Sequence, residues 1–300
     1  MDKFYSKLAN PPSHKDMKKR VSPNSIKSVN KLMKCAFNTA KDWELIKKNP
    51  FENAILPKVE YGERGILTND QLIIVLNKCD DPRLSLAINM SFSCTLRIGE
   101  ILGITWDNVF IDDEYIFNDD AHIIIDKQLQ RLSVEALDQR GNDGVIKIFP
   151  NKTTGEHKTV LALVDPKTKG SNRKIWLPKT LAYMLQEWRN NQNELKFLLD
   201  NEYNDYNLVL CLENGNPCTA SVINNAWRHL RKELNIPKNV VFHSFRHMSI
   251  TYKLKLNKGD IKVTQGDSGH TQANMIMDVY AHIIDEERKV NAQLFNDNFY

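Results

Sequence analysis

The first long periodic stretch of the sequence lies near its start. The run SPNS at residues 22–25 has Ser and Pro in the order that favours a helix N-cap followed by the first helical position. Apolar residues then recur at helical spacing from Ile26 to Trp43. The pattern predicts an amphipathic helix that ends near residues 45–46. The stretch 49–66, which contains prolines and glycines, is typical of a linker.

A second periodic region begins at Thr68, which with Gln71 forms a capping-box pattern ahead of the apolar run LIIVL. The stretch 83–106 indicates two helices with Arg97 near their junction. From about residue 109 to 178 the helical spacing gives way to short β-rich runs split by turn residues, which predict a small antiparallel sheet. These runs are YIF, HIIIDKQL, GVIKIFP, TVLALV and RKIWLP. Helical periodicity then returns, so we expect a mainly α fold with a small antiparallel β-sheet, of the α+β class.

Length and composition limit the classes of protein that fit. A chain of 300 residues with 41% hydrophobic content favours two domains, which we place at 1–60 and 61–300. No apolar run approaches the roughly 20 residues of a membrane span, and the start of the chain lacks the apolar stretch of a signal peptide. We therefore expect a cytoplasmic protein without a membrane partner. The five cysteines are odd in number and form no CxxC pair, which argues against a disulfide framework or a zinc knuckle.

Charge is unevenly distributed along the chain. Residues 1–60 hold 13 Lys and Arg against 6 Asp and Glu, whereas the remainder holds 28 against 31. This asymmetry favours a polyanion-binding module at the start of the chain, and a solvated basic helix face is the alternative.

The candidate chemistry rests on an ordered set of cations and one phenol. Arg97 stands in TLRIGE and His243 and Arg246 in HSFRH; His270 follows Arg246 by 24 positions and Tyr280 follows His270 by 10. Two arginine forks can hold the non-bridging oxygens of a phosphodiester, and neighbouring cations favour the phenolate form of a tyrosine nucleophile. The set therefore predicts phosphoryl transfer.

Plainer interpretations exist for each member of the set. The arginines also fit surface ion pairs, and Tyr280 also fits a core or surface aromatic. His243 and His247 have the spacing of a metal-binding helix, but no HExxH glutamate is present and no third ligand is evident, so we expect no metal.

Three stretches resemble the boxes of a known family. TLRIGEILGITW is similar to the first arginine box of the tyrosine recombinases, the phage integrase family; HSFRH resembles their HxxR box, and GHTQANMIMDVYAH their Gly-His to Tyr box. The family commonly has an apolar residue just before Gly-His, where this chain has Asp267 and Ser268. The basic stretch 22–51 resembles the core-DNA-binding domain of integrases from phages and conjugative transposons of Gram-positive bacteria.

The resemblance implies a two-domain architecture and a reaction. Residues 1–60 would be a partial helical core-DNA-binding domain, and residues 61–300 a catalytic domain with the β-sheet insertion at 109–178 and a C-terminal tail helix at 286–300. Tyr280 would attack DNA to give a 3′-phosphotyrosyl link and a free 5′-hydroxyl, with no metal, ATP or other cofactor. The protein would be an enzyme, a site-specific recombinase that integrates and excises a mobile element.

The resemblance also implies roles for the other site residues. Arg97 and Arg246 would hold the phosphate, His243 would assist proton transfer, and His270 would donate to a phosphate oxygen. A lysine in a β-hairpin turn between the runs TVLALV and RKIWLP would protonate the leaving 5′-oxygen. We select Lys169 because it stands at the tip of that turn, with Lys167 as the alternative. Glu100 would orient an arginine rather than react.

Partners and alternatives follow from the same family. The expected partner is double-stranded DNA, bound by a homotetramer through exchange of C-terminal tails in the bacterial nucleoid, with an excisionase as a further partner. The alternatives are an architectural or regulatory DNA-binding protein of the same fold and DNA relaxation of the type IB topoisomerase kind.

Overall fold

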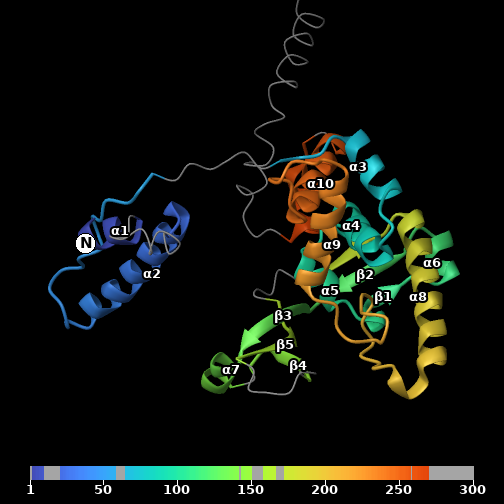
Figure 1. The fold of residues 1–300 in the computed structure, drawn as a ribbon, viewed down its shortest axis with the longest axis horizontal. Coiled ribbons are helices and arrows are strands. Elements are labelled where there is room, and N and C mark those ends of the chain that lie inside the picture. The colour runs from blue at the N-terminus through green and yellow to red at the C-terminus, as the bar shows by residue number, and fades with distance from the viewer. Residues whose placement is uncertain are drawn as a thin grey trace, which may run out of the picture. The chain divides into compact units, whose positions relative to one another are not determined.

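The computed structural model describes residues 2–9, 21–58, 65–141, 143–150, 158–166, 172–257 and 259–269. The chain forms two compact units, Met1–Glu63 and Arg64–Tyr300 (Figure 1). None of the helices in the described ranges combines the length and apolar character that crossing a membrane requires.

The first unit contains the helices α1 (Asp2–Ala9) and α2 (Pro23–Asp42). Ser22 is the N-cap of α2, and its hydroxyl oxygen accepts a hydrogen bond from the backbone N–H of Ser25, as the sequence predicts. Tyr5 and Ile26 pack with Phe51 to form a small buried core.

The end of α2 differs from the prediction. The helix stops at Asp42, three to four residues before the expected end near residues 45–46. Glu44 has a φ of +59°, a left-handed conformation that a right-handed helix cannot contain. Trp43 therefore lies outside the helix and is 71% exposed, so it does not extend the apolar stripe.

The second unit is built mainly from helices, as expected. They include α3 (Asn69–Asn77), α4 (Pro82–Ser93), α5 (Ile98–Gly103), α6 (Asp113–Phe117), α7 (Val134–Arg140), α8 (Lys179–Leu199), α9 (Ala220–Glu233), α10 (His243–Leu256) and α11 (Ile261–Ser268), with short 3-10 turns at Trp106–Asn108 and Asp200–Glu202. The predicted capping box at the start of α3 is present, with Thr68 and Gln71 bonded to each other's backbone. The two helices predicted within 83–106 are α4 and α5.

The strands in the described ranges form two antiparallel sheets, whereas the sequence predicted one. The first contains β1 (Val109–Phe110), β2 (His122–Ile125) and β6 (Arg173–Trp176) in the order β1-β2-β6, and the second contains β3 (Gln128–Ser133), β4 (Val145–Phe149) and β5 (Thr159–Val164) in the order β3-β5-β4. The run YIF, expected to be a strand, belongs to α6. The run HIIIDKQL is divided between the two sheets at residues 126–127.

The separation into two sheets also corrects the expected hairpin. The runs TVLALV and RKIWLP correspond to β5 and β6. The sequence predicts that these two strands pair with each other around a lysine-bearing turn. In the structure β5 pairs with β3 and β4, whereas β6 pairs with β2. The two strands belong to different sheets, so they do not form the expected hairpin. Local β-propensity identifies strands but does not specify their partners.

Helix α5 lies directly against strand β3 because two glycines face that strand. A Cβ added to Gly103 would come within 2.7 Å of the Gln128 Cα, and one added to Gly99 within 3.3 Å of the Leu129 carbonyl oxygen. Helix backbone and strand backbone therefore meet without an intervening side chain.

The main core lies among the helices of the second unit, where α10 packs against α4 (Figure 1). Trp227 of α9 and Phe245 of α10 are both buried, and their rings meet edge to face with centroids 4.9 Å apart. This packing holds α10 beside the segment that joins α4 to α5. The expected fold class, mainly α with small antiparallel β-structure, is confirmed.

Candidate active site

Arg97 is placed by the start of α5. It occupies the N-cap position with an extended backbone, and the carboxylate of Glu100 accepts hydrogen bonds from the Arg97 backbone N–H at 2.9 Å and from Arg97 Nη1 at 2.9 Å. Glu100 is 5% exposed, whereas the Arg97 side chain is 38% exposed. One buried carboxylate thus caps the helix and orients a guanidinium that remains open to solvent.

Arg246 comes from α10 and lies in the interior, with its side chain 1% exposed. Its Nη1 donates to the carbonyl oxygen of Thr95 and lies 3.9 Å from Glu100 Oε2. Thr95 has a φ of +57°, and its hydroxyl lies 2.7 Å from the hydroxyl of Ser249 on α10. The two boxes that carry Arg97 and Arg246 are therefore joined in the fold through Glu100 and Thr95.

A third arginine, Arg173, joins this group and was not predicted. Its Nη2 and Nη1 donate to the two carboxylate oxygens of Glu100 at 2.9 and 3.3 Å, and its Nε donates to the carbonyl oxygen of Asp267 at 2.9 Å. Its inward position follows from the alternation of strand β6. In β6, Ile175 is buried and Trp176 is 57% exposed, so strand alternation places Arg173 on the inward face. An inward arginine requires a buried partner.

The balance of charge in this cluster is positive. Arg97, Arg173 and Arg246 surround the single carboxylate of Glu100. Burial acts to raise the pKa of Glu100, but hydrogen bonds and positive charge from Arg173, together with Arg97, outweigh it and hold the pKa below its ordinary value of 4.5. Burial lowers the pKa of Arg246 to about 9, and the charge of Arg97 acts in the same direction. Arginine keeps its proton at neutral pH, so Arg246 is a buried cation there.

His243 is the first residue of α10 and is exposed. Its ring meets the ring of His247 edge to face, with centroids 4.6 Å apart. The helical spacing places His243 three positions before Arg246, at the end of the helix where backbone N–H groups favour an anion. Among the residues that the structure describes, no three His, Cys, Asp or Glu side chains group as metal ligands would.

Four predicted site residues lie outside the described residues: Lys167, Lys169, His270 and Tyr280. Their roles remain predictions. The described strands β5 and β6 do not pair with each other, so a position at the tip of a hairpin no longer favours Lys169 over Lys167. The predicted tail helix at 286–300 also lies outside the described residues.

Helix α11 and its C-cap immediately precede His270. Helix α11 ends at Ser268, and its C-cap Gly269 has a φ of +60° in the left-handed region. Asp267 and Ser268 stand just before Gly-His, where the resemblance leads us to expect an apolar residue. Asp267 forms an ion pair with Lys253 of α10. The polar turn is therefore accommodated by a partner on the neighbouring helix.

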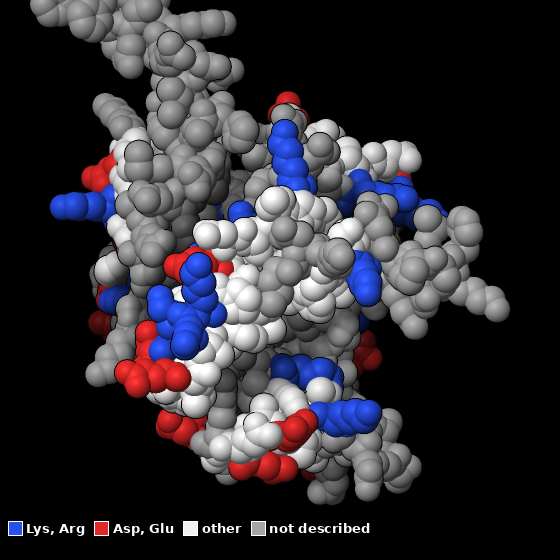
Figure 2. Space-filling model, turned by 90° about the vertical axis from the view of Figure 1, so that its left-hand side faces the viewer, with Lys and Arg blue, Asp and Glu red and all other residues white. Residues whose placement is uncertain are grey.

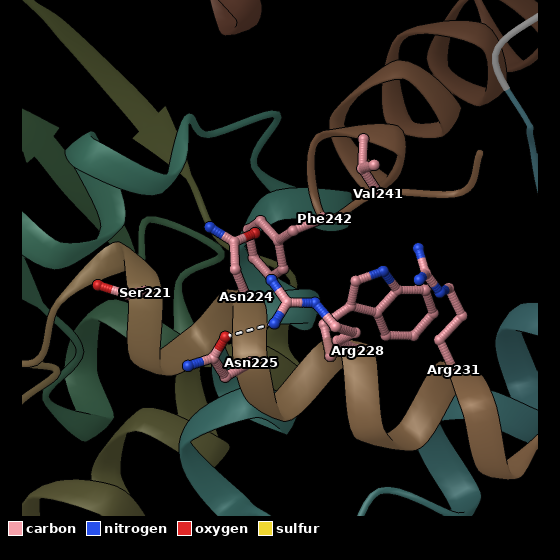
Figure 3. A pocket seen from close by; sticks show the side chains of 8 residues that line it. Ser221, Asn224, Asn225, Arg228, Arg231, Val241 and Phe242 are labelled. Carbon is pink, nitrogen blue, oxygen red and sulfur yellow. Dashed lines mark hydrogen bonds between the residues drawn. The ribbon is translucent and has the colours of Figure 1, made fainter. Parts of the chain in front are cut away.

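A hollow of about 440 Å³ lies beside the start of α10 (Figure 3). Most of its lining comes from one face of α9, and Val241 and Phe242 complete it immediately before His243. Arg228 Nη1 donates to the side-chain oxygen of Asn225 at 2.9 Å, and both residues are exposed. This α9 face, defined here as Ser221, Asn224, Asn225 and Arg228, presents hydroxyl, amide and guanidinium groups.

Positive and negative side chains are interspersed on part of the surface, so net charge does not identify an anion site there. On the face drawn in Figure 2, Lys and Arg side chains lie among Asp and Glu side chains. The arrangement of individual cations, as around Glu100, is therefore more informative than total charge.

The profile of the phage integrase family matches residues 127–287, which is more than half of the chain. The chain belongs to the phage integrase family. This confirms the resemblance seen in the three sequence boxes. The match includes Arg173, Arg246 and α9, and it begins after Arg97.

Individual relatives agree with this assignment. The chain is 26% identical over 290 residues to a tyrosine recombinase XerC-like protein of Caldanaerobacter subterraneus, covering 93% of this chain and 67% of that protein. It is 22% identical over 279 residues to the ICEBs1 integrase of Bacillus subtilis, covering 91% of this chain and 66% of that protein. The chain thus spans about two thirds of the length of these relatives.

Solved structures share the fold. The Tn1549 transposon integrase, in complex with transposon right end DNA, superposes with a TM-score of 0.70 at 22% identity, covering 93% of this chain and 82% of that one. A lambda integrase dimer bound to a COC′ core site gives 0.55 at 14% identity, covering 93% and 79%. The expected tyrosine-recombinase fold is confirmed.

Proposed function

We propose that the protein is a site-specific DNA recombinase that cleaves and rejoins DNA strands during integration and excision of a mobile element. The proposal draws on family membership and on the names of its relatives, which include integrases and tyrosine recombinases. Such a protein would act on DNA in the bacterial cytoplasm.

The observation that carries the proposal is the cluster around Glu100. Arg97 and Arg246 converge on one buried carboxylate from segments that are far apart in sequence. A phosphodiester carries one negative charge and non-bridging oxygens that suit guanidinium donors. Donors fixed before the substrate arrives stabilise the extra charge of a phosphoryl-transfer transition state, by a few kcal/mol for each donor.

The proposed reaction uses the tyrosine that the family resemblance identifies. The phenol oxygen of Tyr280 attacks the scissile phosphorus, and the bond from phosphorus to the 5′-oxygen breaks. A lysine, Lys167 or Lys169, gives that oxygen a proton, while His243 assists proton transfer from the phenol and His270 donates to a phosphate oxygen. An incoming 5′-hydroxyl then attacks the phosphotyrosine and reverses the step on another strand. Because the phosphotyrosyl link retains the energy of the broken phosphodiester bond, the exchange needs no external energy source.

The α9 face is the part of the second unit that we assign to duplex DNA. Amide and guanidinium groups pair with base edges in the major groove, which is wide enough to admit an α-helix. The face lies next to the start of α10, so a helix bound in the groove would bring His243 to the DNA backbone. The lysine-rich first unit would add phosphate contacts.

Assembly is also part of the proposal. Exchange between two duplexes needs several active sites, so we expect a homotetramer on DNA whose protomers contact one another through the segment 286–300. An excisionase would bias the direction of the reaction.

A suicide substrate tests the proposal. DNA nicked near the cleavage site loses a short fragment after cleavage and traps the covalent adduct, which denaturing gels resolve. The wild type should form the adduct, Tyr280→Phe should not, and Tyr183→Phe, at an exposed tyrosine of α8, should behave as wild type. Binding with steep salt dependence but without an adduct would instead indicate an architectural protein. Relaxation of supercoiled plasmid without strand exchange would indicate a topoisomerase.

A further inference from the structure

Arg173 connects the arginine cluster to the end of α11. Its side chain is 7% exposed, and its Nε, Nη1 and Nη2 are all engaged within the protein. Two of these nitrogens hold Glu100, and the third holds the Asp267 backbone. These contacts span 73 and 94 positions of sequence. All three of these nitrogens are bonded within the protein, so Arg173 links these neighbouring segments to one another.

Gly269 lies directly against this guanidinium. A Cβ added to Gly269 would come within 2.9 Å of Arg173 Nη1 and 3.0 Å of Cζ, and the glycine has a φ of +60°. Any other residue would be strained by the backbone conformation and would also displace the arginine. The contact fixes the backbone at the position from which the chain continues to residue 270.

We propose that Arg173 is a positioning residue for strand cleavage: it ties the backbone that leads into His270 to the same carboxylate that orients Arg97 and Arg246. This inference rests on the proposed recombinase function. Planar donors at fixed angles make arginine suited to this task, because one guanidinium can serve a carboxylate and a carbonyl at once. A lysine at the same position could pair with Glu100 but could not also reproduce the bond to Asp267.

The main test compares Arg173→Lys with wild type in two measurements. We expect the variant to bind a single DNA site within about threefold of wild type, but to form the suicide-substrate adduct about 10 to 100 times more slowly, because a displacement of about 1 Å at a reacting group has effects of this size. Melting temperatures of both proteins check that folding is retained. Arg189→Lys, at an exposed arginine of α8, is the matched control and should keep the wild-type rate. An unchanged rate in Arg173→Lys would overturn the inference.

Two further measurements separate positioning from general damage. Gly269→Ala should slow cleavage as Arg173→Lys does, and the double variant should be no slower than the slower single variant, since both disturb one contact. If the double variant lost rate by the product of the two single-variant factors, the inference would be overturned. A DNA substrate with sulfur in place of the leaving 5′-oxygen needs no acid, and it should not restore the rate of Arg173→Lys. Restoration would show that Arg173 acts on the lysine that protonates that oxygen.

The outcomes also distinguish this inference from the function on which it rests. If wild-type protein forms an adduct and Arg173→Lys matches its rate, only the role of Arg173 is wrong. If wild-type protein forms none on its own DNA site, the recombinase proposal is wrong and the inference falls with it.

Discussion

The hydroxyls of Thr95 and Ser249 lie 2.7 Å apart although 154 positions separate the two residues in sequence. Both side chains are buried, with exposures of 0% and 1%. Their bond ties the segment before Arg97 to α10, which carries Arg246. Thr95 keeps a left-handed backbone that is unusual for a β-branched residue, so the surrounding packing must maintain it.

Removing one hydroxyl of this pair should destabilise the fold. Ser249→Ala leaves the buried hydroxyl of Thr95 without this partner, and we expect a loss of about 1–3 kcal/mol in the free energy of unfolding, measured by urea denaturation. A double-mutant cycle with Thr95→Ala should show coupling. The exposed pair Thr219 and Ser221, with hydroxyls 3.1 Å apart, is the control and should change stability by less than about 0.5 kcal/mol. Equal effects at the two pairs would contradict the prediction.

Glu100 should make stability depend on acid. The pKa of Glu100 is lower in the fold than its ordinary value of 4.5, so its stabilising contribution is present above that value and is lost as pH falls through the lowered pKa. Glu100→Gln should therefore melt at a lower temperature than wild type at pH 7, and the gap should narrow below about pH 4.5. At neutral pH the loss should be about 3–5 kcal/mol, because arginine charges lose a buried partner. Glu135→Gln, at an exposed site on α7, is the control, and a gap that did not narrow would refute the assignment.

The α9 face should contribute to recognition of the DNA site. Asn225→Ala is expected to reduce binding to the specific site by about 1–3 kcal/mol and to leave binding to random duplex nearly unchanged, since an amide reads base edges. Fluorescence anisotropy at several salt concentrations measures both. Asn190→Ala on α8 is the control. Equal weakening on both DNAs would assign Asn225 to phosphate contact instead.

The acid for the leaving oxygen should be either Lys167 or Lys169. Alanine at the acid should slow adduct formation on ordinary DNA and restore it on DNA with a 5′-bridging sulfur, because a thiol is far more acidic than an alcohol and departs unaided. Alanine at the other lysine should have little effect on either substrate. Lys179→Ala, where an exposed lysine pairs with Asp119, is the control. If the sulfur-containing DNA rescued neither lysine variant, the acid would be a different residue.

Removal of the C-terminal segment should affect assembly more than binding. A chain ending at Asp285 should bind one DNA site with nearly the wild-type dissociation constant but form fewer complexes that hold two duplexes, as native gels and light scattering would report. Loss of both to the same degree would indicate that the segment packs within its own protomer.

The sequence predicted the parts of the site that depend on local pattern. Arg97 and Glu100 lie three positions apart on one helical turn, and their contact follows from that spacing. Helix starts at Ser22 and Thr68 were predicted from capping residues whose hydrogen bonds are equally local.

What the sequence did not predict depends on contacts between distant segments. The contacts of Arg173 form only when β6 and α11 lie side by side in the fold. Nothing near Arg173 in the chain specifies that it will contact Glu100 or Gly269. The pairing of β5 with β3 rather than with β6 has the same origin, because the apolar alternation of a strand does not name its partner. The end of α2 was predicted wrongly because Glu44 adopts a left-handed conformation, which a glutamate in the sequence does not predict.

The glycines of α5 have a mechanical consequence. With Gly99 and Gly103 facing β3, helix and strand touch through their backbones, and no flexible side chain between them can absorb a displacement. A force applied to the sheet β3-β5-β4 would therefore reach α5, whose N-cap is Arg97, with little loss.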